Sequence, residues 1–166
     1  MDASSHDELA PTKNVTSVEQ KSDREVVVTR SFDAPARLVF EAWSKPELFK
    51  RWWVPKSMGM TLHSCEMDVR TGGTYRLGFG AGMDFFGTYL EVAPPSRIVW
   101  TNDEGAENGS ITTVTLTEQD GRTLLVMSEL YPSKEALDAD GAGAADATHE
   151  TFGQLEELLV ELASEA

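Results

Sequence analysis

Residues 146–162 read DATHETFGQLEELLVEL, and the spacing within this stretch decides the fold. Mainly apolar side chains recur at alternating steps of four and three residues, which places them on one stripe of an α-helix. The stripe consists of Thr148, Phe152, Leu155, Leu159 and Leu162, and the opposite side carries Glu150, Gln154, Glu157 and Glu161. Asp146 is a suitable N-cap. Because Gly153 costs about 1 kcal/mol relative to Ala inside a helix, we expect packing to hold this helix.

The chain before this helix is mostly strand-like, so a sheet is the expected packing partner. We expect strands at residues 25–32, 60–67, 74–79, 84–92, 97–102, 110–117 and 122–131. Two short helices follow the first strand, one beginning near Pro35 and one covering Glu47 to Trp53. The later connections have hairpin length, which favours an antiparallel meander. The order predicts an α+β domain in which one curved antiparallel sheet of about seven strands wraps a long C-terminal helix.

The first 23 residues are polar and show neither a helical nor a strand period. We therefore interpret 1–23 as a flexible N-terminal tail and 24–166 as a single domain. The length of 166 residues is sufficient for a substantial core. A second flexible segment, an acidic joint rich in glycine, is expected at Asp138 to Gly143, just before the long helix.

Composition excludes several classes of function. The net charge of −14 argues against a partner that is a nucleic acid or an anionic membrane, because both require a basic surface. No apolar run approaches the roughly 20 residues of a membrane span, so no membrane insertion is expected. The chain has one cysteine, Cys65, and its N-terminus lacks the apolar core of a signal peptide. The cytoplasm is therefore the expected location.

Charge is distributed unevenly along the chain. Acidic side chains dominate from Glu129 to Ala166, where Lys134 is the one base, whereas bases outnumber acids from Arg24 to Lys56. The two segments can be separate solvated faces, or they can lie side by side or form a surface for a partner.

Motifs with a specific chemistry are missing from the sequence. His63 and Cys65 share a face of their predicted strand, but neighbours two apart lie roughly 6.5–7 Å from each other, too far for a nucleophile and its base. The three histidines are scattered and show no metal-ligand spacing. We find no phosphate loop, dinucleotide fingerprint or nucleophile elbow. We therefore expect no catalytic residues, no cofactor and no metal.

Several motifs between Arg24 and Leu162 resemble the bacterial proteins related to the activator of Hsp90 ATPase, which belong to the START-like, Bet v 1-like helix-grip (SRPBCC) superfamily. The matching segments are RSFDAP at 30–35, VFEAW at 39–43, RWW at 51–53, DVRTGGTYR at 68–76, FGTY at 86–89 and PSRIVW at 95–100. The resemblance implies the helix-grip fold, with a hydrophobic ligand cavity between the sheet and the long helix.

The same resemblance suggests where the cavity is roomy. Relatives often carry two methionines at the start of the last helix, where this chain has Ala144 and Thr148. Large side chains on the inner strand faces are expected to line the pocket. The predicted ligand-binding residues are Trp53, Tyr75, Leu77, Phe79, Trp100, Met127, Glu129, Thr148, Phe152 and Leu155.

Glu129 is the most informative polar residue in this set. By strand parity it shares a face with Leu125 and Met127, where its carboxylate would hydrogen-bond a ligand or act as a base. The alternative is that it lies at the strand end and reaches water.

Three functions follow from these observations. The first is binding of a small apolar or amphipathic molecule. The second is an interaction module with a chaperone partner, linked to the stress response, as in the eukaryotic Hsp90 activators. The third and weakest is an enzyme of cyclase or hydrolase type, which no residue cluster supports. The sequence also leaves a homodimer open.

Overall fold

The structure is a computed structural model that describes residues 16–59, 62–78, 84–102 and 110–165; for Met58, Asp84, residues 139–147 and Glu165 it describes the backbone alone. The strands are β1 (Ser17–Gln20), β2 (Glu25–Phe32), β3 (Ser64–Met67), β4 (Thr74–Gly78), β5 (Asp84–Ala93), β6 (Arg97–Thr101), β7 (Ile111–Gln119) and β8 (Arg122–Leu130). The helices are α3 (Ala36–Ser44), α4 (Pro46–Trp52), the 3₁₀ turn η1 (Lys56–Met58) and α5 (Lys134–Glu165).

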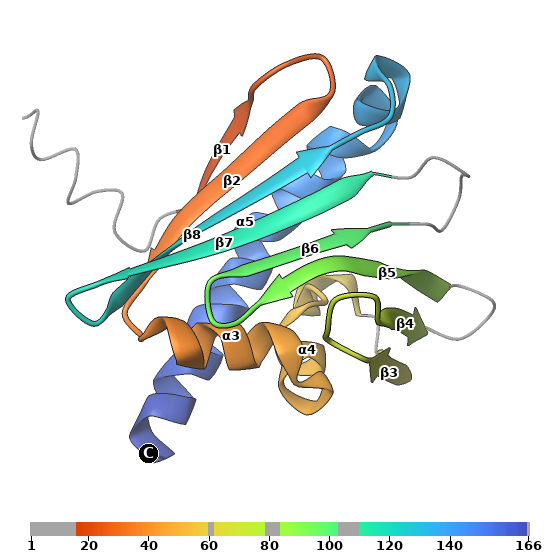
Figure 1. Ribbon diagram of the computed structural model, residues 1–166. Coiled ribbons are helices and arrows are strands. Elements are labelled where there is room, and N and C mark those ends of the chain that lie inside the picture. The colour runs from red at the N-terminus through yellow and green to blue at the C-terminus, as the bar shows by residue number, and fades with distance from the viewer. Residues whose placement is uncertain (1–15, 60–61, 79–83, 103–109, 166) are drawn as a thin grey trace, which may run out of the picture.

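All described strands form one curved antiparallel sheet in the order β1-β2-β8-β7-β6-β5-β4-β3 (Figure 1). From β3 to β8 each strand pairs with the next along the chain, and β2 then closes on β8 through the register Val28↔Met127. This arrangement confirms the predicted α+β helix-grip architecture, with a long C-terminal helix and a meander of six strands.

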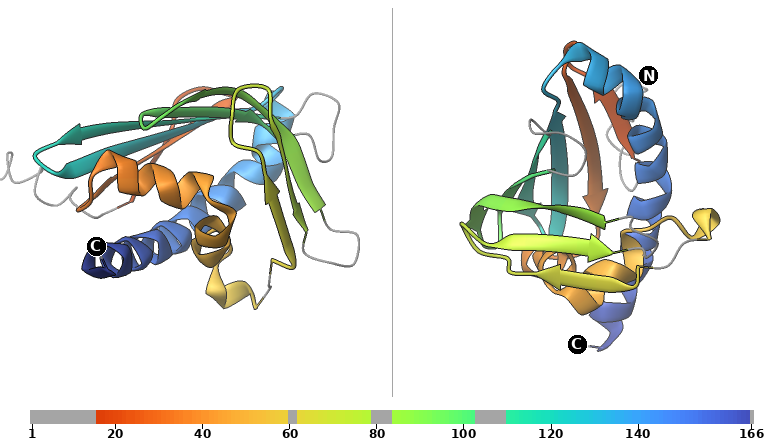
Figure 2. Two further views of the ribbon diagram at one scale, coloured as in Figure 1. Left: turned by 60° about the horizontal axis from the view of Figure 1, so that its bottom comes forward. Right: turned by 90° about the vertical axis from the view of Figure 1, so that its right-hand side faces the viewer.

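The three α-helices lie on the same, concave side of the sheet, and we call this side the inner face (Figure 2). Alternation places every second strand residue on it. The inner face is buried at Val28, Phe32, Ile98, Val114, Leu116, Leu125 and Met127. None of the described helices covers the opposite face, which carries Thr113, Thr115 and Thr117 of β7 together with the exposed Leu124 and Leu130 of β8.

Helices α3 and α4 close one end of the inner face. The first turn of α3 is capped from the sheet, because the Ala36 N–H donates to Glu118 at 2.8 Å. Pro46 stands at the start of α4, where a missing N–H costs nothing. The indole N–H of Trp52 donates back to the Ala42 carbonyl at 2.9 Å, which fixes α4 against α3. Both helices were predicted at these positions.

Helix α5 is longer than predicted. It begins at Lys134, not near Asp146, and continues through the residues that we interpreted as a flexible acidic joint. Ser133 caps it: the Ala136 N–H donates to the Ser133 hydroxyl at 3.1 Å. The predicted boundary gave too much weight to Gly141 and Gly143. Glycine lowers helix propensity without breaking the hydrogen-bond ladder as proline does, so a capped helix can run through it.

The tail prediction is also wrong in part, because Ser17–Gln20 form strand β1. This strand pairs with β2 from Ser17↔Thr29 to Gln20↔Val26. Its sequence, SVEQ, has one apolar residue, so no alternation was visible. Polar composition is typical of an edge strand, where charge discourages pairing with other chains. The ordered sheet therefore begins before residue 24.

Within the described residues, no helix is long and apolar enough to cross a bilayer.

Candidate functional site

The apolar residues predicted to line a pocket come together on the inner face. Tyr75, Leu77, Trp100 and Met127 are buried there, and Phe152 and Leu155 of α5 are fully buried against them. Trp53 and Thr148 are half-buried, and Phe79 lies outside the described residues. The role of these residues as ligand contacts stays a prediction.

An aromatic cluster joins α3, α4 and α5 at this wall. Its centre is Trp43, whose ring lies 4.7 Å from Trp52, 5.7 Å from Trp100 and 6.3 Å from Phe152. Trp53 stacks on Phe49 at 4.8 Å. Trp52 is fully buried and Trp53 is not, so the two adjacent indoles do differ in exposure. Sequence reasoning did not select Trp43 or Phe49 for the site, although VFEAW identified the helix that carries Trp43.

The inner face changes from apolar to polar where β6, β7 and β8 meet. Strand pairing puts Trp100 opposite Thr112 and Thr112 opposite Glu129. Asn102, just after β6, and Ser110, just before β7, extend this row. With Tyr75 from β4, they form the group that we call the polar cluster: Tyr75, Trp100, Asn102, Ser110, Thr112 and Glu129.

Asn102 is the hub of the polar cluster. Its Oδ1 accepts from Trp100 Nε1 at 3.3 Å and lies 3.1 Å from the Tyr75 hydroxyl oxygen. Its Nδ2 donates to the Ser110 and Thr112 hydroxyl oxygens, both at 3.0 Å. The Ser110 hydroxyl in turn donates to Glu129 Oε2 at 3.0 Å. Glu129 is half-buried and follows the buried Met127 on the same face.

A glycine makes the placement of Tyr75 possible. Gly87 of β5 pairs with Tyr75, and a Cβ at Gly87 would lie 2.9 Å from the tyrosine ring and 1.9 Å from the Thr101 oxygen. Only glycine fits this close approach. The Tyr75 hydroxyl therefore reaches the Thr101 carbonyl oxygen at 2.7 Å, beside Asn102.

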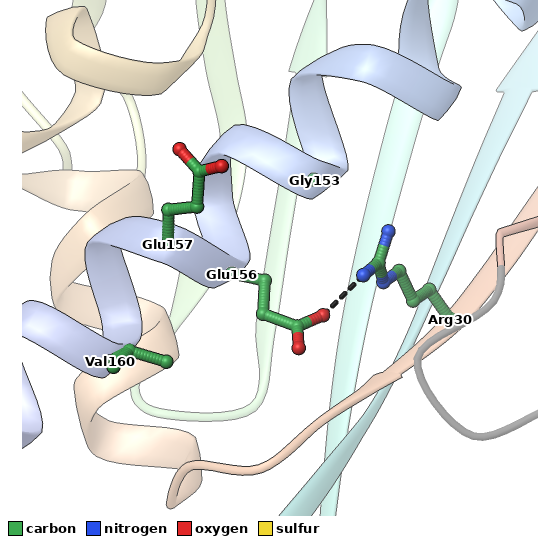
Figure 3. A pocket seen from close by; sticks show the side chains of 5 residues that line it. All are labelled: Arg30, Gly153, Glu156, Glu157 and Val160. Carbon is green, nitrogen blue, oxygen red and sulfur yellow. Dashed lines mark hydrogen bonds and ion pairs between the residues drawn. The ribbon is translucent and has the colours of Figure 1, made fainter.

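A separate cavity of about 450 Å³ lies between β2 and α5. Its lining is Arg30, Gly153, Glu156, Glu157 and Val160, none of which we predicted for the site (Figure 3). Gly153 leaves room in it, since a Cβ there would meet nothing within 4 Å. The volume falls within the roughly 300–1,000 Å³ that is usual for a ligand pocket, but the cavity is open and three of its five lining residues are charged.

Arg30 is the unexpected residue in this cavity. It stands on the inner face between Val28 and Phe32 and is 8% exposed. Its Nη2 pairs with Glu156, and its Nη1 donates to Thr16 Oγ1 at 3.1 Å. Its Nε–H has no partner among the described atoms. The signal was present in the sequence, because a charge at an inward strand position is rare unless it is paired.

Groups that would support covalent or metal chemistry do not converge within the described residues. Burial raises the pKa of the Cys65 thiol to about 11, which leaves little thiolate at neutral pH. Burial likewise raises the pKa of the Tyr89 phenol. In the described parts of the chain, no three His, Cys, Asp or Glu side chains gather around a possible metal position.

Solved structures share this fold. A protein from Rhodobacter sphaeroides is 24% identical with a TM-score of 0.77 over 89% of this chain and 99% of that one. A Nitrosomonas europaea protein is 22% identical with a TM-score of 0.77 over 87% and 99%, and a Mycobacterium smegmatis protein is 24% identical with a TM-score of 0.73 over 89% and 99%. Identities at this level show the fold alone.

The sequence itself gives the family. No curated protein matches this chain at a significant level. The family described as activator of Hsp90 ATPase homolog 1-like protein matches residues 33–160, which include α3, α4, the meander and most of α5. The chain therefore belongs to the family of activator of Hsp90 ATPase homolog 1-like proteins.

Proposed function

We propose that this chain is a cytoplasmic binding protein that takes a small apolar or amphipathic molecule between the inner face of the sheet and α5. The observation that carries the proposal is the polar cluster at the edge of a buried apolar and aromatic wall. Burying a polar side chain on an inward face costs free energy unless its hydrogen bonds are satisfied. In a ligand pocket, the few polar groups fix the orientation of the ligand. An amphipathic molecule matches both parts of this surface.

The test uses Nile red, a neutral dye whose emission rises in apolar surroundings. We expect saturable binding with 1:1 stoichiometry. Thr148→Trp should weaken binding at least tenfold, because Thr148 is half-buried on the sheet-facing stripe of α5 and a larger ring would fill the space. The matched control is His149→Trp, at the neighbouring exposed position, which should bind like the parent. Equal binding by both variants, or no binding by the parent, overturns the proposal.

A co-chaperone role is the second candidate. It is favoured by the family match and by Ile111 and Leu130, which pair across β7 and β8 and are both exposed on the face without helices. The measurement is the ATPase rate of an Hsp90-type chaperone with and without this chain. Stimulation that Ile111→Lys removes supports this role, and an unchanged rate excludes it.

A further inference from the structure

We propose that the cavity between β2 and α5 is a second binding site, which takes a neutral molecule with vicinal hydroxyl groups, such as a polyol or a sugar. This site is separate from the proposed apolar pocket, because none of its lining residues was predicted for that pocket. The inference follows from the fixed position of the Arg30 guanidinium, from its unpartnered Nε–H and from the carboxylate beside it.

The Arg30 guanidinium is held in place at the base of the cavity. Its Nη1 donates to Thr16 Oγ1 at 3.1 Å, and its Nη2 pairs with Glu156. The ring centroid of Phe32 lies 5.2 Å from Arg30 Cζ, so the ring covers one face of the guanidinium. A ligand therefore meets a group that folding has already ordered, and preorganisation of this kind favours binding.

The Nε–H is the part of Arg30 that the described residues leave unsatisfied. The Nε atom is buried and has no hydrogen-bond partner among them. The planar guanidinium directs Nε–H and one N–H of Nη2 in parallel from the same edge, which is the fork that binds carboxylates with two hydrogen bonds. Glu156 binds the Nη2 half of this fork alone. Because a buried donor without an acceptor costs free energy, the open half beside Glu156 favours a ligand atom.

The space for a ligand lies beside Gly153. A Cβ at this position would meet nothing within 4 Å, and Gly153 precedes Glu156 by three residues, on the same side of α5. Figure 3 shows the Glu156 side chain pointing across the cavity toward Arg30, with Gly153 on the neighbouring turn. The cavity of about 450 Å³ is large enough for a small ring compound.

The neighbouring carboxylate decides which atom suits the Nε–H. An atom bound there lies next to Glu156, so it must accept from Arg30 and donate to Glu156. A hydroxyl group does both. A carbonyl or carboxylate oxygen would turn its lone pairs toward the Glu156 oxygens, and an ammonium would turn its N–H groups toward Arg30. The two glutamates and one arginine of the lining also disfavour an anion.

The second oxygen of Glu156 favours two hydroxyls on neighbouring carbon atoms. Arg30 binds Glu156 through Oε1 and is the one described partner of this carboxylate. One hydroxyl can therefore bridge Arg30 and Glu156 while its neighbour donates to Oε2. Val160, which is exposed at the same cavity, offers an apolar surface to the carbon skeleton. A vicinal diol on a small ring matches these three features.

A purely structural role explains only part of this arrangement. Arg30 joins β2 to α5 through Glu156, and this accounts for the contact of Nη2. It accounts neither for the buried Nε–H nor for a glycine at position 153, where a side chain would have room. A bound water molecule is the remaining alternative, because water also donates and accepts at one atom.

The experiment uses the Arg30 Nε–H as its own probe, because a buried Nε–H gives a resonance in ¹H–¹⁵N spectra. The protein is titrated at about pH 6 with ring compounds of one size: cis-1,2-cyclohexanediol, cyclohexanol, cyclohexanone, cyclohexanecarboxylate and cyclohexylamine, which is protonated there. We expect the diol to shift the resonance saturably, with a Kd of about 1–10 mM. The ketone, the carboxylate and the ammonium should bind at least about tenfold more weakly, and cyclohexanol should lie between them and the diol.

A first pair of variants tests the place of binding. Gly153→Leu should abolish the shift, because its side chain would occupy the open space beside Arg30. The matched control is Ala163→Leu, which introduces the same side chain at an exposed position of α5 and should bind the diol like the parent.

A second pair tests the chemistry without changing the volume of the cavity. Glu156→Gln should weaken diol binding about threefold or more and reduce the discrimination against cyclohexanecarboxylate to about threefold or less. The control is Glu161→Gln, which changes the net charge equally and breaks the exposed pair with Arg51. It should keep the preference of the parent.

The outcomes separate this inference from the proposed function. Absence of a saturable shift with about 100 mM diol would show that water alone fills the cavity, and equal binding of the ketone or the carboxylate would exclude the hydroxyl; either result overturns the inference. Saturating diol should leave Nile red bound, and displacement of the dye would overturn the assignment of two sites. If Nile red does not bind the parent but the diol does, the proposed function fails and this inference stands.

Discussion

Leu155 shows most directly how the helix is held. It has no exposed surface and belongs to the central core cluster with Phe32, Trp43 and Phe152. Val160, five residues further along the same helix, is 64% exposed. The two residues therefore provide an internal comparison of the buried and solvated sides of α5.

We expect Leu155→Ala to lower the free energy of unfolding by about 2–5 kcal/mol, because it removes buried methyl groups and leaves a cavity. Val160→Ala should change it by about 0.5 kcal/mol or less, as surface substitutions do. Urea unfolding followed by tryptophan fluorescence measures both. A loss below about 0.5 kcal/mol for Leu155→Ala would contradict its placement in the core.

Several site residues are understood better from the structure than from the sequence. Parity correctly put Met127 and Tyr75 on the inner face, because alternation survives in any strand. The helical period placed Gln154 on the side opposite the apolar stripe of α5, yet Gln154 is only 8% exposed. A glutamine can be buried when all its hydrogen bonds are made, and the helical period alone carries no information about such partners.

At the scale of elements, the segment after α4 is fastened to α5 by polar side chains. Gln154 Nε2 donates to the carbonyl oxygens of Trp52 at 3.0 Å and Val54 at 2.9 Å, and its Oε1 accepts from the Lys56 N–H at 2.8 Å. One turn earlier, Glu150 accepts from Ser57. We call this set of contacts the α5 clamp.

Gln154→Leu should remove the three hydrogen bonds that Gln154 contributes to the α5 clamp, without creating a large void. Because three backbone groups lose their partner, we expect a loss of about 2–4 kcal/mol in unfolding free energy. Amide exchange at Lys56 should accelerate more than exchange in β8. The control is Glu161→Gln, which removes the exposed ion pair with Arg51 and should cost about 0–1 kcal/mol. Unchanged Lys56 exchange in Gln154→Leu would show that the clamp does not hold this segment.

The clamp also has a pH dependence. The Ser57 hydroxyl and then its backbone N–H lower the pKa of Glu150 below its usual value of 4.5. A carboxyl group whose pKa is lower in the folded state stabilises above its unfolded pKa, and this contribution is lost as pH falls through the folded pKa. The protection factor of the Ser57 amide, which is its intrinsic exchange rate at each pH divided by the observed rate, should therefore decrease below about pH 4.5. Glu150→Gln should flatten this profile; an equally steep profile in that variant would rule out Glu150 as its source.

The Arg51–Glu161 pair bears on the uneven charge along the chain. Together with the Arg30–Glu156 pair, it shows the basic segment next to the acidic helix at two points, whereas Lys45 pairs with Glu41 at the end of α3. Of the interpretations that the sequence left open, the two segments lying side by side therefore holds for Arg30 and Arg51, whereas Lys45 pairs locally. Charge counts along a sequence could not distinguish them, because each pair depends on which side of its helix a residue occupies.

At the scale of the whole molecule, the architecture could be predicted from the sequence, whereas the edge strand β1 and the start of α5 could not. Hairpin-length connections specify neighbouring strands, so the meander followed from residues such as Gly72 and Gly121 between strands. Strand β1 and the first turns of α5 were missed because their composition is polar or rich in glycine. The polar cluster was identified only in part: Asn102 and Ser110 flank a connection, and only the pairing of β6 with β7 brings them together.

Net charge dominates the response of the whole molecule to salt. The ion pairs are mostly exposed and individually weak, whereas the net charge of −14 destabilises the compact state by repulsion. We expect the Tm to rise as NaCl increases from about 10 to about 200 mM, because salt screens that repulsion. Arg51→Glu, which takes the net charge from −14 to −16, should show a steeper rise. A Tm that falls with salt would mean that ion pairs prevail.

The pairing of β2 with β8 has a consequence for folding during synthesis on the ribosome. Glu25 and its partner Ser128 are 103 residues apart, and in the folded sheet β2 lies between β1 and β8. At about 5–20 residues per second, a ribosome needs roughly 5–20 s to deliver the missing strand. Through that interval the run Val26-Val27-Val28 has β1 as a neighbour on one edge but lacks β8 on the other. Nascent chains should therefore depend on holding chaperones more than full-length chains do when they refold.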